Sequence, residues 1–329
     1  MEFSELGRMA SGHVEARIIQ AALQLEIFDQ IGSTATDSHS LAAALHLDPR
    51  ATEMMLNALA ALKLLQKNGE FFSLPPAAAR YLIRSSPHYL GGMILFDASL
   101  WHCWERLAET VRSGKPARPA NMYQDDPSET EIFINAMDSL VKARGDADMV
   151  ARVVDWEKAT NLLDIGSGPG TYPIQLCRKF PELRATIFDL PGTLRITERY
   201  VRDAKLEERI KLIPGDYRTD SIAGNYDIIF LSNIIHGEGH DENQALIAKL
   251  YPNLESGGKI IIKDHILNPT RVEPPVGAIF SLLMLLTTES GRCYSFDEIK
   301  SWMERAGFSQ VRQIDLSPPL TSSLVIGTK

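Results

Sequence analysis

Two kinds of hydrophobic patterning divide the chain. From residue 14 to residue 83, apolar residues recur every three to four positions, which is the spacing that buries one face of a helix. After Asp155, short apolar runs alternate with helical patterns, and this alternation predicts βαβ units and a mostly parallel sheet. The runs that predict seven strands are 161–165, 185–188, 210–213, 226–231, 259–262, 310–314 and 322–326. The pattern therefore predicts an α/β domain preceded by a helical one.

The first part of the chain has the layout of a winged helix-turn-helix. Asp48 is a good N-cap and Pro49 suits the first helical position, so a helix is expected to begin there. Asn68-Gly69 predicts the tight turn of a hairpin over 64–74. Such modules often bind DNA, but residues 36–66 carry little positive charge to meet phosphates. A dimerisation or packing module is the favoured interpretation.

Between these parts lies a stretch rich in aromatic residues. Residues 89–112 have a helical pattern, 115–127 have the proline and glycine content of a loop, and a helix is expected from about residue 128. Trp101 and Trp104 have helical spacing that suits core packing, and their nearness to the loop also allows pocket lining. At the other end of the chain, Ser295-x-x-Glu298 predicts a capping box that opens the last helix.

Composition narrows the class of protein. The 329 residues are 44% hydrophobic and 23% charged, which is typical of a globular protein of about two domains. There are 34 basic and 42 acidic residues, and the net charge of −8 disfavours a nucleic-acid partner. Residues 1–12 contain no apolar run typical of a targeting signal, so we expect a cytoplasmic protein. The longest apolar stretch, 276–286, is too short for a membrane span of about 20 residues and predicts a buried helix.

The central motif is a glycine-rich segment that directly follows the first predicted strand of the sheet. Residues 164–170 read Asp-Ile-Gly-Ser-Gly-Pro-Gly, with glycine at 166, 168 and 170. Neither the dinucleotide spacing nor the lysine of a phosphate-binding P-loop is present. The glycines allow close approach of a ligand to the backbone, and Asp164 can pair with a cationic group.

Two further acids follow the next two predicted strands. Asp189 is the middle residue of a Phe-Asp-Leu segment and is placed to accept hydrogen bonds from ribose hydroxyls. Asp216 is the middle residue of a Gly-Asp-Tyr segment and could reach an adenine amino group. The carboxyl ends of neighbouring parallel strands converge on one crevice. A ligand with an amine, a ribose diol and adenine but no phosphate is S-adenosylmethionine, which we predict as the cofactor.

These motifs resemble a known family. Residues 163–170, 188–191, 215–216 and 231–236 are similar to the successive motifs of class I O-methyltransferases of the plant caffeic-acid and bacterial natural-product type. The resemblance covers nearly the whole chain and implies an N-terminal winged-helix module that forms an intertwined homodimer and helps to close the substrate pocket. The cofactor contacts that it implies are Asp164, Gly166, Gly168, Gly170, Asp189, Leu190, Gly215, Asp216, Tyr217 and Ser232.

The resemblance also implies the catalytic residues. His236 follows the fourth strand, where the family has the general base that takes a proton from the acceptor hydroxyl. Asp264, 28 residues later, matches the acid that orients this histidine. His236 and His240 are four residues apart, but Gly237 and Gly239 disfavour the helix that a shared metal would need, and the family works without metal, so no metal site is predicted.

The sequence departs from the plant members at several positions. Cys293 aligns with a second family glutamate near the histidine, Ser232 replaces a lysine, and Glu238 replaces a tryptophan. These changes favour the bacterial branch. Met284 matches a methionine that lines the acceptor pocket, although core packing explains it equally well. The predicted pocket residues are Met284, Cys293, Trp101 and Trp104.

Together these observations predict an S-adenosylmethionine-dependent O-methyltransferase that acts on a hydroxyl of a small aromatic metabolite. We expect a winged-helix dimerisation domain over 1–90, a helical connector contributing to the substrate pocket over 91–150, and a cofactor-binding domain over 151–329. The expected partners are a small-molecule acceptor and a second copy of the chain, with no nucleic acid and no membrane. The alternatives are transfer to nitrogen or carbon, a non-methylating relative, and a ligand-sensing winged-helix regulator. The sequence leaves the acceptor open.

Overall fold

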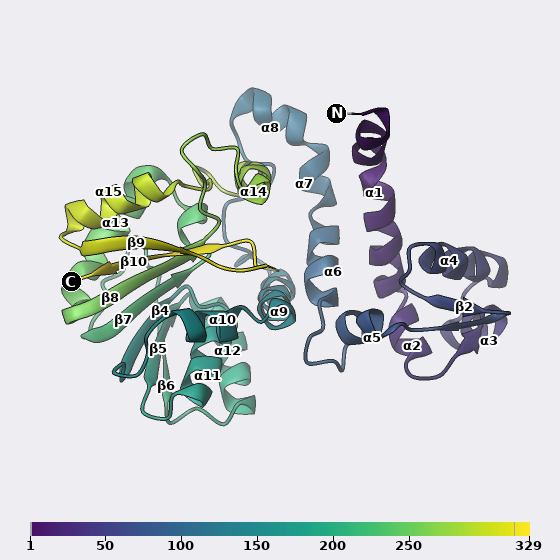
Figure 1. Cartoon of the computed structure of the whole chain (residues 1–329), viewed down its shortest axis with the longest axis horizontal. Coiled ribbons are helices and arrows are strands. Elements are labelled where there is room, and N and C mark those ends of the chain that lie inside the picture. The colour runs from purple at the N-terminus through teal and green to yellow at the C-terminus, as the bar shows by residue number, and fades with distance from the viewer. Residues whose placement is uncertain (1, 319) are drawn as a thin grey trace. The chain divides into compact units, whose positions relative to one another are not determined.

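The computed structural model describes residues 2–318 and 320–329, and these form two compact units (Figure 1). The first comprises residues up to Leu100 together with Asn135–Ala143. The second comprises Trp101–Ile134 and Arg144–Lys329. The sequence analysis divides the chain at residues 90 and 150 by role, into a dimerisation domain, a connector and a cofactor-binding domain. This division stays a prediction.

The first unit is a helical module with a small sheet. Its helices are α1 (Phe3–Gln24), α2 (Ile27–Ile31), α3 (Ser38–Leu45), α4 (Pro49–Ala61), α5 (Pro76–Leu82) and α6 (Gly91–Ser99). Its strands are β1 (Thr36–Asp37), β2 (Gln66–Asn68) and β3 (Phe71–Ser73), in the order β1-β3-β2. The helix pair α3–α4 followed by the antiparallel hairpin β2–β3 confirms the predicted winged-helix layout.

Local chemistry explains where α4 begins. Asp48 is its N-cap, and the carboxylate accepts a hydrogen bond from the Ala51 amide at 2.8 Å. Pro49 is the first helical residue, where its missing N–H costs nothing. Leu56 and Leu59 then bury the inner face of α4 against Phe28 and other core residues of this unit.

The second unit is built on a seven-stranded sheet. Its strands are β4 (Asn161–Ile165), β5 (Arg184–Asp189), β6 (Ile210–Pro214), β7 (Tyr226–Ser232), β8 (Leu254–Asp264), β9 (Ser309–Asp315) and β10 (Ser323–Thr328). All seven predicted strands are confirmed. Their order is β6-β5-β4-β7-β8-β10-β9, with β4 to β8 parallel and β10 antiparallel to both of its neighbours.

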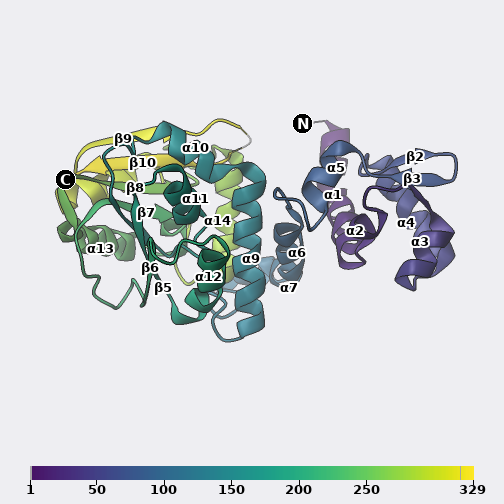
Figure 2. The same cartoon turned by 90° about the horizontal axis from the view of Figure 1, so that it is seen from below.

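Helices cover both faces of this sheet (Figures 1 and 2). One face carries α10 (Asp146–Val153), α11 (Thr171–Lys179) and α12 (Pro191–Asp203), and the other carries α13 (His240–Leu250) and α15 (Phe296–Ala306). β5 and β7 lie on either side of β4. Helix α11, which connects β4 to β5, covers one face, and α13, which connects β7 to β8, covers the other. The carboxyl end of β4 is therefore the switch point where α/β proteins form a crevice.

The remaining helices are short, apart from α9 and α14. They are α7 (Trp101–Glu105), α8 (Leu107–Ser113), α9 (Pro127–Arg144), α14 (Pro275–Thr287), and the 3-10 turns η1 (Ile235–Gly237) and η2 (Tyr251–Asn253). The predicted loop lies between α8 and α9, and Ser295 and Glu298 form the predicted capping box at the start of α15.

One expectation about α14 is wrong. Residues 276–286 form a helix as expected, but it is not buried on all sides within the chain. Ile279 is 61% and Leu282 38% exposed, whereas Met284 and Leu286 are buried. An apolar sequence alone does not specify how many faces of a helix find a neighbour. Among the described residues, no helix combines the length and the apolar character needed to cross a membrane.

Candidate active site

The glycine-rich loop after β4 adopts a conformation that requires its glycines. Gly166, Gly168 and Gly170 have φ angles of 62°, 61° and 75°, in the left-handed region that other residues rarely occupy. A Cβ atom at Gly166 would also clash with the Cδ1 atom of Ile234. The loop therefore brings its backbone closer to the crevice than residues with side chains would allow.

Asp164, the last residue but one of β4, is buried beneath this loop with an unsatisfied carboxylate oxygen. Its Oδ2 atom accepts a hydrogen bond from Ser167 Oγ at 2.6 Å, while Oδ1 has no partner among the described residues. Burial raises the pKa of this carboxyl to about 8. Buried carboxylate oxygens are expected to have partners. The orphaned oxygen therefore fits a ligand that brings an ammonium group.

Asp189 ends β5 and holds the loop in place. Its carboxylate accepts hydrogen bonds from the Gly168 amide at 2.8 Å and the Leu190 amide at 2.7 Å. Burial raises its pKa to about 6, although both amides favour the ionised form. Carboxylate oxygens have further lone pairs, so Asp189 retains capacity to accept from a ligand's hydroxyls. Gly215 follows β6, and a side chain there would meet the Phe188 ring.

The third predicted acid is engaged by a neighbour. Asp216 forms an ion pair with Arg218 at 2.8 Å, and this hydrogen bonding lowers its pKa. Tyr217 lies beside the glycine loop, because its Cε1 atom is 3.7 Å from the Cβ position of Gly166, and its hydroxyl donates to Glu238 Oε1 at 2.8 Å. Burial raises the pKa of both Tyr217 and Glu238. The residues around a cavity of about 220 Å³ here are Tyr217, Arg218, Glu238, Glu242, Ala245, Leu246 and Lys249.

His236 and Asp264 form a hydrogen-bonded pair at the same edge of the sheet. His236 lies in η1 just after β7, and its Nδ1 atom is 2.8 Å from Asp264 Oδ1. The side chains are 13% and 1% exposed, so the acid does not face solvent. Burial alone would raise the pKa of Asp264, but His236, His265 and the His265 amide outweigh it and lower that pKa. Asp264 is thus a buried, ionised partner for the imidazole.

Phe280 is a site residue that sequence reasoning missed. Its ring lies edge-to-face against the His236 ring, with centroids 4.8 Å apart and an interplanar angle of 81°. Phe280 precedes Met284 by four residues on α14, so both share one face of that helix. This spacing, applied to the predicted helix, would have been sufficient to identify Phe280.

The other predicted pocket residues take different environments. Cys293 is buried, and burial raises the pKa of its thiol to about 12, so it is neutral. Trp101 and Trp104 are half-buried on α7, which packs against α14. Ser232, predicted as a cofactor contact, is half-buried at the end of β7. Helices α7 and α14 therefore lie on the side of the site near His236. Cys293 provides no carboxylate where the plant members have a second glutamate.

His240 belongs to a different environment from His236. Its Nε2 atom accepts a hydrogen bond from Trp302 Nε1 at 3.0 Å, and its Nδ1 atom is 2.9 Å from Asp241. Among the described residues, no three His, Cys, Asp or Glu side chains lie together in a group that could hold a metal ion.

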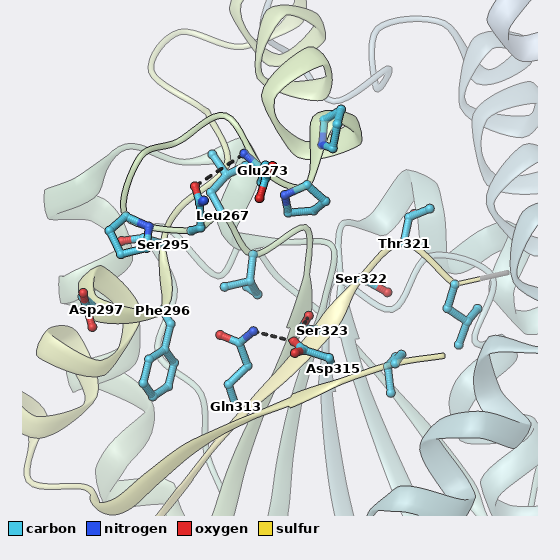
Figure 3. A pocket seen from close by; sticks show the side chains of 17 residues that line it. Leu267, Glu273, Ser295, Phe296, Asp297, Gln313, Asp315, Thr321, Ser322 and Ser323 are labelled. Carbon is cyan, nitrogen blue, oxygen red and sulfur yellow. Dashed lines mark hydrogen bonds between the residues drawn. The ribbon is translucent and has the colours of Figure 1, made fainter. Parts of the chain in front are cut away.

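A larger cavity of about 710 Å³ lies where β9 ends and β10 begins (Figure 3). Leu267, Glu273 and the start of α15 line it, and Asp315 accepts hydrogen bonds from Gln313 and Ser323 within it. It contains none of the residues predicted to bind the cofactor or the acceptor.

Comparisons with known proteins agree with this geometry. Residues 104–309 match the family model of the O-methyltransferase domain, and residues 8–84 match that of the O-methyltransferase dimerisation domain. The tetracenomycin polyketide synthesis 8-O-methyl transferase TcmO of Streptomyces glaucescens is 31% identical over 95% of this chain and 93% of that protein. The 3-hydroxy-5-methyl-1-naphthoate 3-O-methyltransferase of Streptomyces sahachiroi is 28% identical over 98% and 94%.

Solved structures show the same architecture. PigF with SAH has a TM-score of 0.89 and 25% identity, and the match covers 100% of both chains. An O-methyltransferase family protein from Burkholderia thailandensis has a TM-score of 0.89 and 26% identity, over 100% of this chain and 98% of that one.

The strand order and the glycine loop after β4 define an S-adenosylmethionine-dependent methyltransferase. The chain belongs to the O-methyltransferase family that carries an N-terminal dimerisation domain, and the relatives it matches include natural-product enzymes.

Proposed function

We propose that the protein methylates a hydroxyl group of a small aromatic metabolite, with His236 as the general base and Asp264 as the residue that orients it. The observation that carries the proposal is the 2.8 Å contact between His236 Nδ1 and a buried carboxylate beside the cofactor crevice. A histidine held by a buried acid is the usual construction of a general base.

The hydrogen bond determines which nitrogen acts. An ionised carboxylate only accepts, so the Nδ1 atom of His236 carries the proton and Nε2 has the lone pair. Nε2 therefore takes the proton as the acceptor oxygen attacks. Asp264 stabilises the imidazolium that forms, because its negative charge lies next to Nδ1 in a buried site.

The cofactor supplies an electrophilic methyl group on a sulfonium. We assign its amino group to Asp164, whose Oδ1 atom needs a donor, and its ribose hydroxyls to Asp189. The glycine loop, which lacks side chains at residues 166, 168 and 170, allows the close approach that this placement needs. Holding the acceptor oxygen and the methyl carbon in near-attack geometry is expected to provide most of the rate acceleration.

An aromatic acceptor is supported by the walls near His236. Phe280 contacts the base, Met284 lies on the same face of α14, and α7 brings Trp101 and Trp104 to this side. Aromatic and thioether side chains suit a flat apolar ring. The relative from Streptomyces sahachiroi is named for a hydroxynaphthoate, so 3-hydroxy-1-naphthoate is a suitable first probe.

A homodimer is supported by the dimerisation domain and by the surface of α1. Phe3, Leu6, Met9 and Val14 are all at least 47% exposed and follow one side of this helix. We propose that the module over 1–90 forms the dimer and that the connector over 91–150 contributes to the acceptor pocket.

The proposal is tested with methyl-labelled S-adenosylmethionine and a panel of naphthols, other phenols, hydroxyquinones and amines, with the product mass as readout. We expect an oxygen-methylated aromatic product. His236→Ala should bind the cofactor as the wild type does and lose at least about 100-fold in kcat. Asp189→Ala should weaken cofactor binding measured by calorimetry. Nitrogen methylation, or full activity of His236→Ala, would overturn the proposal.

A further inference from the structure

The turn that carries His236 is held by a side chain from α13. Asn243 is fully buried, and its Nδ2 group donates to the Ile235 carbonyl at 2.8 Å and to the Glu238 carbonyl at 3.3 Å. These two carbonyls lie on either side of His236. One amide group thereby connects both ends of the turn.

A second donor reaches the same turn from the segment that precedes α15. Tyr294 is 1% exposed, and its hydroxyl donates to the Glu238 carbonyl at 2.6 Å. Its ring packs edge-to-face on Trp302, with centroids 4.8 Å apart. Packing therefore fixes the phenol, and the hydroxyl meets the Glu238 carbonyl in one orientation.

The backbone of this segment also touches the turn. A Cβ atom at Gly291 would clash with the carbonyl oxygen of His236. Thr288 Oγ1 accepts a hydrogen bond from the Gly291 amide at 3.0 Å, which holds that segment in place. The turn is thus bounded by α13 on one side and by residues 288–294 on the other.

These contacts matter because η1 is too short to hold itself. It comprises three residues, and 3-10 turns have poor hydrogen-bond geometry. A shift of the turn by a few tenths of an ångström would lengthen the 2.8 Å contact between His236 and Asp264 and misdirect Nε2. Among the described residues, Asn243 and Tyr294 hydrogen-bond the backbone of the turn and not the side chains of His236 or Asp264, so we expect them to act on the reaction by placing the turn.

We propose that Asn243 and Tyr294 are positioning residues that hold the turn 235–238 so that His236 meets Asp264 and the acceptor hydroxyl. The proposal rests on the proposed role of His236 as the base. The turn is therefore a built part of the active site, and its two supports lie seven and 58 residues further along the chain.

The chain contains a matched control for each support. Asn253 donates through Nδ2 to the carbonyls of Ile222 and Gly224, at 2.8 and 3.0 Å. Tyr226 donates through its hydroxyl to the Ala223 carbonyl at 2.9 Å. This second asparagine–tyrosine pair holds the loop before β7, at the end of the strand remote from His236.

The experiment compares Asn243→Leu and Tyr294→Phe with Asn253→Leu and Tyr226→Phe in the full chain. Each variant should lower the midpoint of thermal unfolding by a few degrees, because each loses a side-chain hydrogen bond to a backbone carbonyl. Only the first two should lower kcat with 3-hydroxy-1-naphthoate, by about 10-fold for Tyr294→Phe and more for Asn243→Leu. The Kd for S-adenosylmethionine should stay within about twofold. A kcat effect that follows thermal stability in all four variants would overturn the proposal.

A second measurement separates this proposal from the role of His236. In histidine-labelled protein, the Nδ1 proton bound to Asp264 should give a downfield NMR resonance that His236→Ala removes. We expect Asn243→Leu to shift or broaden this resonance and Asn253→Leu to leave it unchanged. An unchanged resonance in Asn243→Leu would refute the positioning role whatever the activity. If His236→Ala retains full kcat and Asn243→Leu still shifts the resonance of its own His236, the base assignment fails and the support of the turn stands.

Discussion

His236 and Asp264 are 28 residues apart in the chain, yet His236 Nδ1 lies 2.8 Å from Asp264 Oδ1. The contact forms because β7 and β8 are adjacent parallel strands, so the residues that follow β7 meet the end of β8. His240 and Asp241 form a contact of 2.9 Å, but their side chains are 45% and 96% exposed. Burial, rather than distance, distinguishes the two pairs.

Asp264→Asn should lower kcat by about 100-fold while leaving the Kd for S-adenosylmethionine within about twofold. The amide is isosteric, but it removes the negative charge that stabilises the imidazolium and can present a donor to Nδ1. Initial rates and calorimetry measure the two quantities. Asp241→Asn is the matched control, because it changes an equally close histidine–aspartate pair that is exposed. Equal rates in Asp264→Asn and the wild type would contradict the orienting role.

Asp164→Asn should stabilise the cofactor-free protein at alkaline pH. The folded-state pKa of Asp164 is about 8, above the ordinary value of 3.8, so the folded protein binds this proton more tightly than the unfolded chain does. The stability that the group contributes is present below about pH 4 and is lost as the pH rises toward and through 8. Urea unfolding at pH 5 and pH 8 measures the free energy of unfolding of both proteins. The difference between Asp164→Asn and the wild type should be at least about 1 kcal/mol more favourable to the variant at pH 8 than at pH 5. An equal difference at both pH values would be inconsistent with a raised pKa.

The same group predicts how cofactor affinity depends on pH. An ammonium group pairs with the ionised form of Asp164, so binding below pH 8 must release a proton. The Kd for S-adenosylmethionine should therefore fall as the pH rises from 6 to 8, by up to about 10-fold per unit. Calorimetry in two buffers of different ionisation enthalpy measures the released proton. Asp164→Asn should bind weakly and without proton release, and a wild-type Kd that is independent of pH would count against the pairing.

Gly166→Ala should weaken cofactor binding and destabilise the fold by about 1–2 kcal/mol, because Gly166 has a left-handed φ of 62°. The added methyl group also meets Ile234 Cδ1. Gly69→Ala is the control, since Gly69 has a φ of 59° and open space around its Cβ position. Gly69→Ala should lose stability but not affinity, as measured by thermal unfolding and calorimetry. Equal cofactor affinity of Gly166→Ala and the wild type would show that the loop tolerates a side chain.

Leu6→Glu combined with Met9→Glu should convert a dimer into a monomer, because both side chains are more than half exposed on α1 within the single chain. Charged groups in an apolar interface would be buried without partners. Light scattering coupled to size-exclusion chromatography measures the mass. Glu15→Gln on the same helix is a control that should remain dimeric. A monomeric wild type, or a double variant that stays dimeric, would contradict the proposed interface.

Much of the fold was predictable because the signals are local. Each predicted strand is a short apolar run, the Asp48-Pro49 start of α4 depends on neighbouring residues, and the glycine loop is read from seven consecutive positions. The family motifs then place His236 and Asp264 on one edge of the sheet. α14 shows the limit, because its composition predicts a helix but not which of its faces packs within the chain.

The fold class, the cofactor motif and the residue types of the active site follow from the sequence, because hydrophobic period and glycine spacing act over a few neighbouring positions. Long-range packing determined the rest. It engaged Asp216 with Arg218, buried Asp164 with one unsatisfied oxygen, and placed Phe280 against His236. Asn243 and Tyr294 reach a single carbonyl from different parts of the chain. Distances and burial of this kind arise only when strands and helices come together.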